Sequence, residues 1–423
     1  MADSLEPDDI RAEVRAWLAD AWAPDRPLRE WRADLAEAGW GCPTWPRQWY
    51  GRGLPAELGR VVAEELRAAG AVGPAIGVGM SLAAPTLLAH APDDLKVRLL
   101  RPIVTGEDTW CQLFSEPGNG SDLAGLTTRA TRDGDEFVVE GQKVWTTGAH
   151  HAAYGMLLAR TDWDLPKHKG ITFFAFPMRQ PGIEVRPLRQ MNGRASFNEV
   201  FLTEARVPVA NVVGELHGGW TVALTTLAHE RGLAAGLFGA LPPSGGGRTR
   251  EEARAEASAY LTTYEWYPQR AGRADLVPVR AVATGAAGDP VTRQVVAHLA
   301  ATERTARWTA ERASAARRAG RPPGAEGSIG KLAASTIARE AAAAHATIAG
   351  ADGMLTGPDS PEGGIVAEVL VSVPGASIAG GTDEVQHNIV GERVLGLPKE
   401  PSVDADVPFR QVKVNRRGAK EDR

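Results

Sequence analysis

The pattern of apolar and polar positions divides the chain into three zones. In the first zone, up to about Asp108, apolar residues recur at three- and four-residue spacing, which is typical of helices with one buried face. Clusters of Pro and Gly such as Gly41–Pro46 separate these helices. The segments that we expect to be helical are Pro7–Ala21, Arg29–Ala38, Ala56–Ala69 and Asp93–Leu100.

The second zone, about Thr109 to Gly214, contains short runs of β-branched and aromatic residues, which favour strands. The turn sequence Arg132–Asp135 predicts a β-hairpin between Leu126–Ala130 and Glu136–Trp145. Several short strands joined by turns indicate a β-barrel or a sandwich. The further strands that we expect are Ala153–Arg160, Ile171–Pro177, Ile183–Leu188 and Glu199–Leu202.

The third zone, Gly219 to about Leu397, is rich in Ala and returns to helical periodicity. Pro242–Gly247 interrupts it and is expected to be a flexible excursion. The polar tail Glu400–Arg423 is expected to be poorly ordered. The helices predicted in this zone are Trp220–Ala240, Pro290–Ala319, Ser328–Ile348 and Asp383–Val394.

Composition narrows the class of protein. The 423 residues allow two or three modest domains, and the net charge of −5 gives no reason to expect nucleic acid or an anionic membrane as a partner. Cys42 and Cys111 are too few and too far apart to predict a disulfide framework or a zinc site. The acidic start of the chain lacks the apolar core of a signal peptide, and we see no long apolar run. We therefore expect a cytoplasmic protein.

Two segments of the β zone carry candidate chemistry. In Trp110–Asp122, Ser115 and Glu116 end an apolar run, and the turn that follows offers backbone amides and a hydroxyl that can approach a phosphate or a flavin. An ordinary surface turn remains the alternative, and a dinucleotide fingerprint is excluded because Leu123 stands where its third glycine belongs. The second segment is Gly141–Gly148, in which Trp145 is followed by two threonines. A large aromatic beside two hydroxyls could form a wall for a planar ring. The alternative is an aromatic residue at the rim of the barrel.

Two further segments lie in the helical third zone. Glu230 interrupts an apolar helix, and such a carboxylate is costly unless it is paired in a salt bridge or functional. Gly380 and Gly381 precede Thr382, which is a predicted helix N-cap. The exposed amides beside this helix N-terminus could bind an anion or a carbonyl group. The alternative is an ordinary capped helix start. The adjacent pair His150–His151 points in divergent directions, so we predict no metal site.

Together these segments resemble the acyl-CoA dehydrogenase family, and within it the bacterial branch of fatty-acid and sterol side-chain degradation. The likeness extends from about Pro7 to Pro398. It is carried by Ser115–Asp122, Gln142–Thr147, the phrase FNEVFL at Phe197–Leu202 and the run GGTDEVQHNIVGERVLGLP that begins at Gly380. The resemblance implies a mainly α fold with a middle β-barrel: an N-terminal helical domain at 1–108, the barrel at 109–214, a C-terminal four-helix bundle at 215–398 and a tail at 399–423.

The resemblance also implies a cofactor, FAD, and a set of site residues. Trp145 would cover the flavin face away from the substrate, and Thr147 would bond the N5 edge. The residues implied to hold FAD are Gln112, Phe114, Ser115, Gly120, Ser121, Trp145, Thr147, Thr382 and Glu384. Those implied to bind the acyl-CoA substrate are Ser121, Arg231, Gly380 and Gly381.

Several positions depart from the family pattern. Many members carry the catalytic Glu where this chain has Gly380, whereas a second group places it on the bundle helix before an Arg, which Glu230-Arg231 matches. The Arg-x-x-Phe-Gly segment is replaced by Asp289–Gln294. The Gln-x-x-Gly-Gly adenine clamp is replaced by Thr347 and Gly350-Ala351. In the family, these two segments contact FAD across subunits, so the resemblance implies that such contacts would be altered here.

The implied reaction is removal of an α-proton by Glu230 and of a β-hydride by FAD, with the Gly380 amide polarising the thioester carbonyl. Electrons would pass to an electron-transferring flavoprotein, and the assembly would be a homodimer, a homotetramer or a heteromer. Two alternatives stay open. One is a flavin-dependent oxygenase or N-hydroxylase on the same fold. The other is a non-catalytic partner subunit of a heteromeric dehydrogenase, which Gly380 favours and Glu230 opposes.

Overall fold

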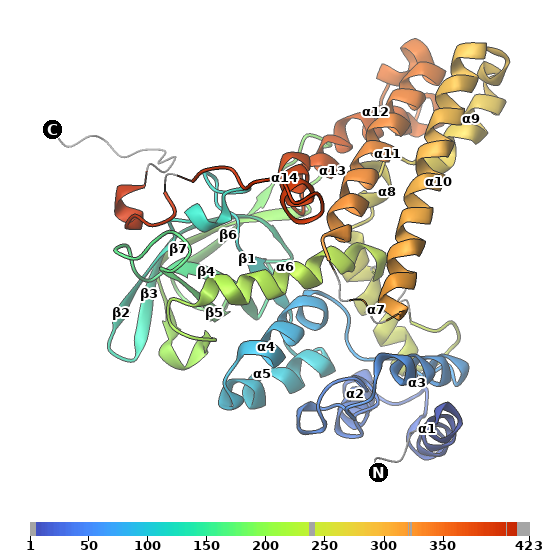
Figure 1. Ribbon diagram of the computed structural model, residues 1–423. Helices are drawn as coiled ribbons and strands as arrows, with labels where there is room; N and C mark the ends of the chain where they lie inside the picture. Colours follow the sequence, from blue (N-terminus) through green and yellow to red (C-terminus); the bar gives the residue numbers. More distant parts are fainter. Residues whose placement is uncertain (1–5, 237–241, 320, 322–323, 403, 413–423) are drawn as a thin grey trace. The chain divides into compact units, whose positions relative to one another are not determined.

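The computed structural model describes residues 6–236, 242–319, 321, 324–402 and 404–412. The described residues form two compact units. The first unit lies within Met1–Leu188, Ala195–Thr263 and Val403–Arg423, and the second within Arg189–Arg194 and Tyr264–Ser402. Figure 1 colours the helices and strands by their order along the chain.

The N-terminal helices agree with the periodicity of the sequence. Trp31 and Leu35 are fully buried at the centre of their core. The segment Gly79–His90 was not predicted, and it forms a π-helical turn, Gly79–Ala83, followed by α4, Ala84–His90. Gly79 and Pro85 resemble loop residues in the sequence, so the periodicity gave no helix signal there. The four predicted helices are found as α1 (Pro7–Ala21), α2 (Leu28–Glu37), α3 (Ala56–Ala68) and α5 (Asp93–Thr105).

The middle zone is one eight-stranded sheet. Its strand order is β6-β7-β3-β2-β4-β5-β8, and β1 pairs with β4 in parallel. The predicted hairpin is confirmed, because β2 and β3 are antiparallel with Asp133 opposite Glu136. The strands are β1 (Trp110–Leu113), β2 (Arg129–Asp133), β3 (Glu136–Thr147), β4 (Tyr154–Arg160), β5 (Ile171–Pro177), β6 (Ile183–Leu188), β7 (Phe197–Pro208) and β8 (Val212–Val213).

The sheet curls around its own apolar core. Phe137 of β3 packs edge-on against Phe174 of β5, with ring centroids 5.2 Å apart, although these strands are not neighbours in the sheet. Inward side chains of both halves belong to one buried cluster, as expected when a sheet closes towards a barrel. The register of β3 and β7 shifts between Lys143 and Thr146. Such an irregularity changes the direction in which the side chains of the two residues between them point.

Helix α6, Gly219–Gly236, packs against β5, α4 and the π-helical turn (Figure 1). A Cβ at Gly219 would lie 2.5 Å from the Phe173 amide nitrogen, so glycine allows the start of the helix to approach the strand closely. The hydroxyls of Thr86 and Thr226 are 2.9 Å apart between α4 and α6, which fixes the two helices in register. The predicted end of this helix at Ala240 lies outside the described residues.

Helix α7, Arg248–Thr262, was not predicted, because it is mostly polar and buries only small residues. Arg32 of α2 reaches Glu256 of α7 at 2.6 and 3.0 Å. The preceding Pro242–Gly247 is more constrained than the expected flexible excursion, since Arg254 donates to the carbonyls of Pro243 and Gly245. A Cβ at Gly247 would also meet the Pro24 carbonyl.

The second unit is helical. The long helices α10 (Pro290–Arg318) and α11 (Glu326–Ala349) confirm the prediction, as does α14 (Asp383–Arg393). Helix α11 contacts α10, α12, α13 and α14 and buries Ala338, Ala341 and Ala344, whose small side chains permit close helix packing. The short helices, which were not predicted, are α8 (Tyr267–Arg270), α9 (Val277–Ala283), α12 (Ile365–Ser372) and α13 (Pro374–Ile378).

One segment, Pro361–Arg393, is long and apolar enough to cross a membrane when judged by length and composition alone. From the sequence, no membrane-spanning run was expected. In the structure the segment is not one continuous helix, because Gly380 and Gly381 take φ values of +69° and +87° between α13 and α14. This makes it weak support for a membrane span.

The described part of the C-terminal tail differs from the expected disorder. Residues 404–412 belong to the first unit, and Phe409 is fully buried there. Its amide donates to the Leu165 carbonyl at 3.0 Å, and Pro408 forms a bridge with Pro166. The polar composition of the tail concealed one apolar anchor.

We expect Arg32→Met to lower the free energy of unfolding by about 2–3 kcal/mol, because it removes one partner of a largely buried ion pair. The Arg32 side chain is only 3% exposed. Arg29→Met on the same helix is the matched control, since Arg29 is 75% exposed and should contribute under about 1 kcal/mol. Thermal unfolding of both variants tests this, and equal shifts in midpoint would contradict it.

Candidate functional site

A buried ion pair organises the end of β1. The Lys143 ammonium, with no solvent exposure, donates to Glu116 Oε1 at 2.9 Å and to the Phe114 carbonyl at 3.0 Å. Glu116 also accepts the backbone N–H groups of Thr127 and Thr128 at 2.7 and 2.8 Å. One carboxylate therefore joins the end of β1, the middle of β3 and the residues that lead into β2.

The charge state of this pair follows from its partners. Burial tends to raise the pKa of Glu116, but Lys143 and the hydrogen bonds from Thr128 and Thr127 outweigh burial and lower the pKa to about 2. Burial lowers the pKa of Lys143, and the adjacent carboxylate opposes that shift. The pair is therefore ionised at neutral pH, and it neutralises two charges that would otherwise be costly to bury.

The loop after Glu116 presents backbone and hydroxyl groups to solvent. Glu116 and Asn119 exchange two backbone hydrogen bonds of 3.1 and 3.0 Å, which close a tight turn. Gly120 and Ser121 are exposed, and a Cβ at Gly120 would meet nothing within 4 Å. Ser115 is anchored, because its carbonyl accepts the Val144 amide at 2.9 Å. The base of the loop is thus fixed while its tip is available to a ligand.

Trp145 lies beside this loop on the irregular part of β3. Its φ of +61° is uncommon for a large residue, and its side chain is 56% exposed. The indole meets Phe197 edge-on at 5.6 Å, which leaves a broad exposed ring surface. Thr146 is buried, with its carbonyl accepting from Asn198 at 2.9 Å, and Thr147 is half-buried. Strained backbone here holds an exposed aromatic wall, a feature that clusters at functional sites.

The structure brings together two of the predicted site residues that are distant in sequence. The amide Nε2 of Gln112, on β1, donates to Oε2 of Glu230, on α6, at 3.1 Å. Both side chains are half-buried. The contact between His90 and Thr225 at 2.7 Å further holds α6 beside α4. Arg231 follows in the helix, but its side chain lies outside the described residues.

Phe114 takes a different orientation from its neighbours in the motif. Its side chain is buried and packs edge-on against Phe173, with ring centroids 6.0 Å apart. The Phe114 ring therefore belongs to the core of the first unit.

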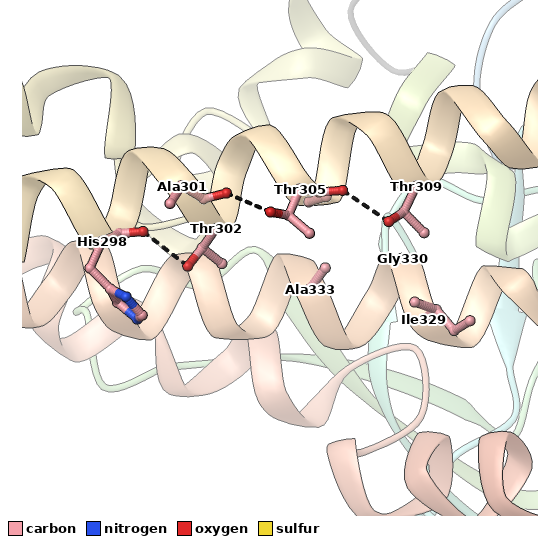
Figure 2. Close-up of a pocket in the computed structure, with 9 residues that line it drawn as sticks. His298, Ala301, Thr302, Thr305, Thr309, Ile329, Gly330 and Ala333 are labelled. Carbon is pink, nitrogen blue, oxygen red and sulfur yellow. Dashed lines mark hydrogen bonds between the residues drawn. The ribbon is translucent and has the colours of Figure 1, made fainter.

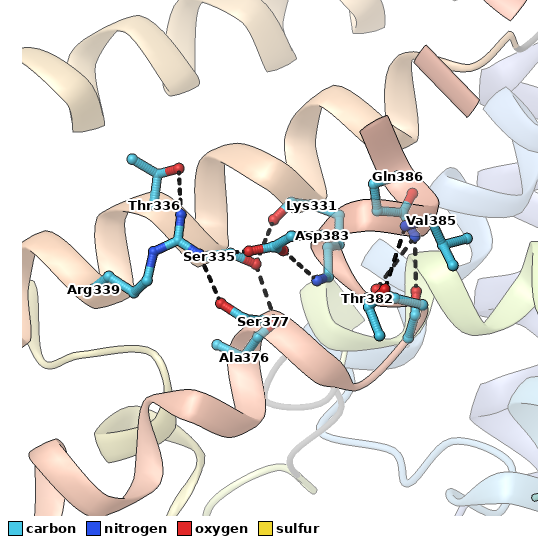
Figure 3. Close-up of polar contacts among 12 residues, drawn as sticks. Lys331, Ser335, Thr336, Arg339, Ala376, Ser377, Thr382, Asp383, Val385 and Gln386 are labelled. Carbon is cyan, nitrogen blue, oxygen red and sulfur yellow. Dashed lines mark hydrogen bonds and ion pairs between the residues drawn. The ribbon is translucent and has the colours of Figure 1, made fainter. Parts of the chain in front are cut away.

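The remaining predicted residues lie in the second unit. Thr382 caps α14 by accepting the Val385 amide at 3.3 Å, and Gln386 donates to the Gly380 carbonyl at 3.1 Å (Figure 3). A Cβ at Gly380 would have open space around it, whereas one at Gly381 would lie 2.5 Å from Gln386. Glu384 is exposed in the first turn of the helix. The glycine loop is thus closed by Gln386 and keeps its amides near a helix N-terminus.

Asp383, which the sequence did not predict as a site residue, holds the start of α14 against α11. It accepts from Lys331 at 2.8 Å and from Arg339 at 2.5 Å, both on α11 (Figure 3). Burial tends to raise the pKa of Asp383, but the hydrogen bond from Lys331 and further donors hold the pKa below its usual range. The sequence did offer a signal for this role: Asp383 directly follows the helix N-cap, and acidic residues are favoured in the first turn of a helix.

A groove of about 390 Å³ runs between α10 and α11 in the same unit (Figure 2). The hydroxyls of Thr302, Thr305 and Thr309 each donate to the carbonyl four residues earlier, at 2.8–3.1 Å. With these hydroxyls engaged, the groove presents mainly methyl groups and small side chains. None of the predicted site residues lines it, so it is separate from the candidate chemistry.

Within the described ranges, no group of three or more His, Cys, Asp and Glu residues lies close enough to hold a metal ion. His150 and His151 contact each other through ring nitrogens 3.1 Å apart.

Three family models match the chain: "Acyl-CoA dehydrogenase, N-terminal domain" at residues 6–107, "middle domain" at 111–205 and "C-terminal domain" at 277–395. The chain belongs to the acyl-CoA dehydrogenase family, whose members are FAD-dependent enzymes.

Its relatives extend this result. Acyl-CoA dehydrogenase FadE34 of Mycobacterium tuberculosis is 37% identical over 94% of this chain, which spans only 50% of the length of FadE34. Acyl-CoA dehydrogenase IpdE1 of the same organism is 35% identical over 93% of this chain and 98% of its own length. The solved ChsE4-ChsE5 complex, also from M. tuberculosis, is similar with 29% identity and a TM-score of 0.56, over 95% of this chain and all of the other.

The site geometry fits FAD in two respects. Gly120 leaves room for close approach of a phosphate to exposed amides. The exposed face of Trp145 suits stacking against a flat ring system.

We expect Glu116→Gln to destabilise the protein at pH 7 by about 3 kcal/mol, because Lys143 would remain buried without its partner. The folded-state pKa of Glu116, about 2, lies below its ordinary 4.5, so its contribution is present above about pH 4.5 and is lost as the pH falls towards 2. The difference between wild type and variant should therefore narrow over that range. Unfolding midpoints at several pH values test this.

Glu140→Gln is the matched control for that prediction. Glu140 is exposed on the same strand as Lys143, so the neutral replacement should leave the midpoint nearly unchanged at every pH. A Glu116→Gln variant with the same pH profile as wild type would show that the pair does not stabilise the fold in the way argued.

Proposed function

We propose that this chain catalyses α,β-dehydrogenation of an acyl-CoA thioester, with Glu230 as the base that removes the α-proton. The observation that carries the proposal is the 3.1 Å hydrogen bond between Gln112 and Glu230. It places a carboxylate from α6 beside the strand that begins the candidate flavin motif. Such a side chain on an apolar helix is costly unless it has a role.

The reaction sets demands that these residues can meet. A thioester α-proton is a weak acid, so the base must be positioned and the carbonyl polarised. Gln112 would hold Glu230 through Oε2, which leaves Oε1 to receive the proton. Gly380 has no side chain, but its backbone N–H would donate to the thioester carbonyl as the chain's own contribution to charge stabilisation. Ser121 and Gly381 would bind the acyl-CoA, together with Arg231.

FAD, when bound, supplies the acceptor for the β-hydride. The residues that would hold it are Ser115, Gly120 and Ser121 of the loop, Gln112 and Phe114 beside them, and the wall Trp145 with Thr147. Thr382 and Glu384 would contact the FAD of this or of a paired subunit. Trp145 would exclude water from one face of the ring, and Thr147 would orient its polar edge. We further propose a cytoplasmic enzyme that passes its electrons to an electron-transferring flavoprotein.

The assembly is a separate part of the proposal. We infer a homodimer, a homotetramer or a heteromer with a second chain of the same family. The ChsE4-ChsE5 complex supports the heteromer, as does FadE34, which is about twice as long as the region that matches this chain. In a heteromer, Gly380 would favour a second role for this chain, that of a non-catalytic partner subunit. Glu230 and its contact with Gln112 favour the catalytic role.

We expect Glu230→Gln to retain FAD and acyl-CoA binding, because the amide preserves shape, and to slow anaerobic flavin reduction by at least about a hundredfold. The measurement is stopped-flow bleaching of the flavin band with a panel of straight-chain, branched and sterol-derived acyl-CoAs. Glu215→Gln, an exposed neighbour before α6, is the control and should reduce at the wild-type rate. Near-normal reduction by Glu230→Gln would place the base elsewhere.

Adding Gly380→Glu to that variant tests the division of roles. The open space at Gly380 admits a side chain, but its φ of +69° strains any residue other than glycine. We expect partial recovery of flavin reduction, well below the wild-type rate. Failure of the double variant to fold with FAD would be judged from its absorbance spectrum before any rate is compared.

We also expect the protein purified alone to be yellow and oligomeric, with FAD released by acid and therefore not covalently bound. Absorbance after denaturation and light scattering measure these properties. A folded but colourless protein that takes up FAD only when produced with a second family member would favour the partner-subunit role. An active FAD-loaded monomer would contradict the proposed assembly.

A further inference from the structure

The described C-terminal segment, residues 404–412, is docked on the end of β4 and the connection between β4 and β5 in its own unit. Phe409 inserts between Trp163, at 5.4 Å between ring centroids, and the guanidinium of Arg160, whose Cζ lies 3.3 Å from the centre of the Phe409 ring. The amides of Phe409 and Arg410 donate to the carbonyls of Leu165 and Trp163 at 3.0 Å. The segment is therefore held by specific contacts and not by chain connectivity alone.

Arg160 links this segment to the loop that carries Ser121. Its guanidinium is fully buried and donates to the carbonyls of Ala124 and Leu126 at 2.7 and 3.2 Å, and to that of Lys167 at 3.2 Å. Phe409 covers the flat face of the same group. Without that cover, water would compete for the guanidinium donors and weaken their hold on the loop carbonyls.

A second link runs through Lys167. Its ammonium contacts Asp404 at 3.0 Å and Asp122 at 2.8 Å, and its side chain is largely buried. Asp122 directly follows Ser121 in the sequence. Two independent side chains of the C-terminal segment thus act, each through one cation, on opposite ends of the stretch 122–126.

We propose that Phe409 and Asp404 are positioning residues for the cofactor loop: the docked C-terminal segment fixes Ser121–Leu126, through Arg160 and Lys167, in the conformation that receives the FAD phosphates. The inference rests on the proposed function for the identity of the ligand. It assigns to the end of the chain a role in FAD affinity, although no residue of the segment need touch the cofactor.

The test compares matched variants of the full-length protein. Phe409→Leu keeps an apolar side chain but removes the ring, and Phe137→Leu makes the same change in the sheet core without contacting Arg160. Both should lower the unfolding midpoint through lost packing. Only Phe409→Leu should raise the dissociation constant for FAD, by about tenfold, and speed amide hydrogen exchange in the peptide 117–128 of the FAD-free protein.

A second set of three variants separates the effect of charge from that of packing. Asp404→Asn should raise the FAD dissociation constant by about threefold, Asp404→Glu should restore it, and Asp406→Asn, the same change at an exposed position, should have no effect. The inference is overturned if Phe409→Leu and Phe137→Leu match in FAD affinity and loop exchange. If the wild type binds no FAD under any condition, the proposed function fails instead. The exchange rates of the FAD-free proteins would still decide whether the segment fixes the loop.

Discussion

The buried ion pair between Glu116 and Lys143 is the contact on which the candidate site depends. Lys143 comes from β3 two residues before Trp145, and Glu116 comes from the start of the glycine loop, so the pair fixes the ring wall relative to the loop. Buried ion pairs add little net stability, since desolvation offsets their attraction. Their value lies in requiring one arrangement: any slip of β3 against β1 would leave two charges without partners in the sheet core.

Around this fixed centre, helix packing brings the Glu230 carboxylate to β1. Gly219 lets α6 start against β5, and the contact between Thr86 and Thr226 sets its register. Because of these contacts, Glu230, which lies eleven residues after Gly219 in the helix, reaches Gln112. A carboxylate on a packed helix is held more rigidly than one on a loop.

Long elements with a clear period were predictable. The bounds of α1 and β5 coincide with the sequence prediction, because each has an uninterrupted pattern of buried positions and a clear break at both ends. Helices α7 and α12 were not predicted, for opposite reasons. The first is polar with only small buried residues, so it has no apolar stripe, and the second is apolar nearly all round. Local patterns reveal a helix only where it has a distinct apolar stripe.

The sequence by itself determined the family, the order of helical, β and helical zones, and most of the candidate site, because motifs such as Ser115–Asp122 are local and specific. Tertiary structure decided which residues meet. It turned the Phe114 side chain into the core, paired Glu116 with Lys143 and joined Gln112 to Glu230. It also docked Phe409 on Arg160. Each of these contacts joins segments whose spacing along the chain carries no signal, since only the packing of the folded chain brings their side chains within bonding distance.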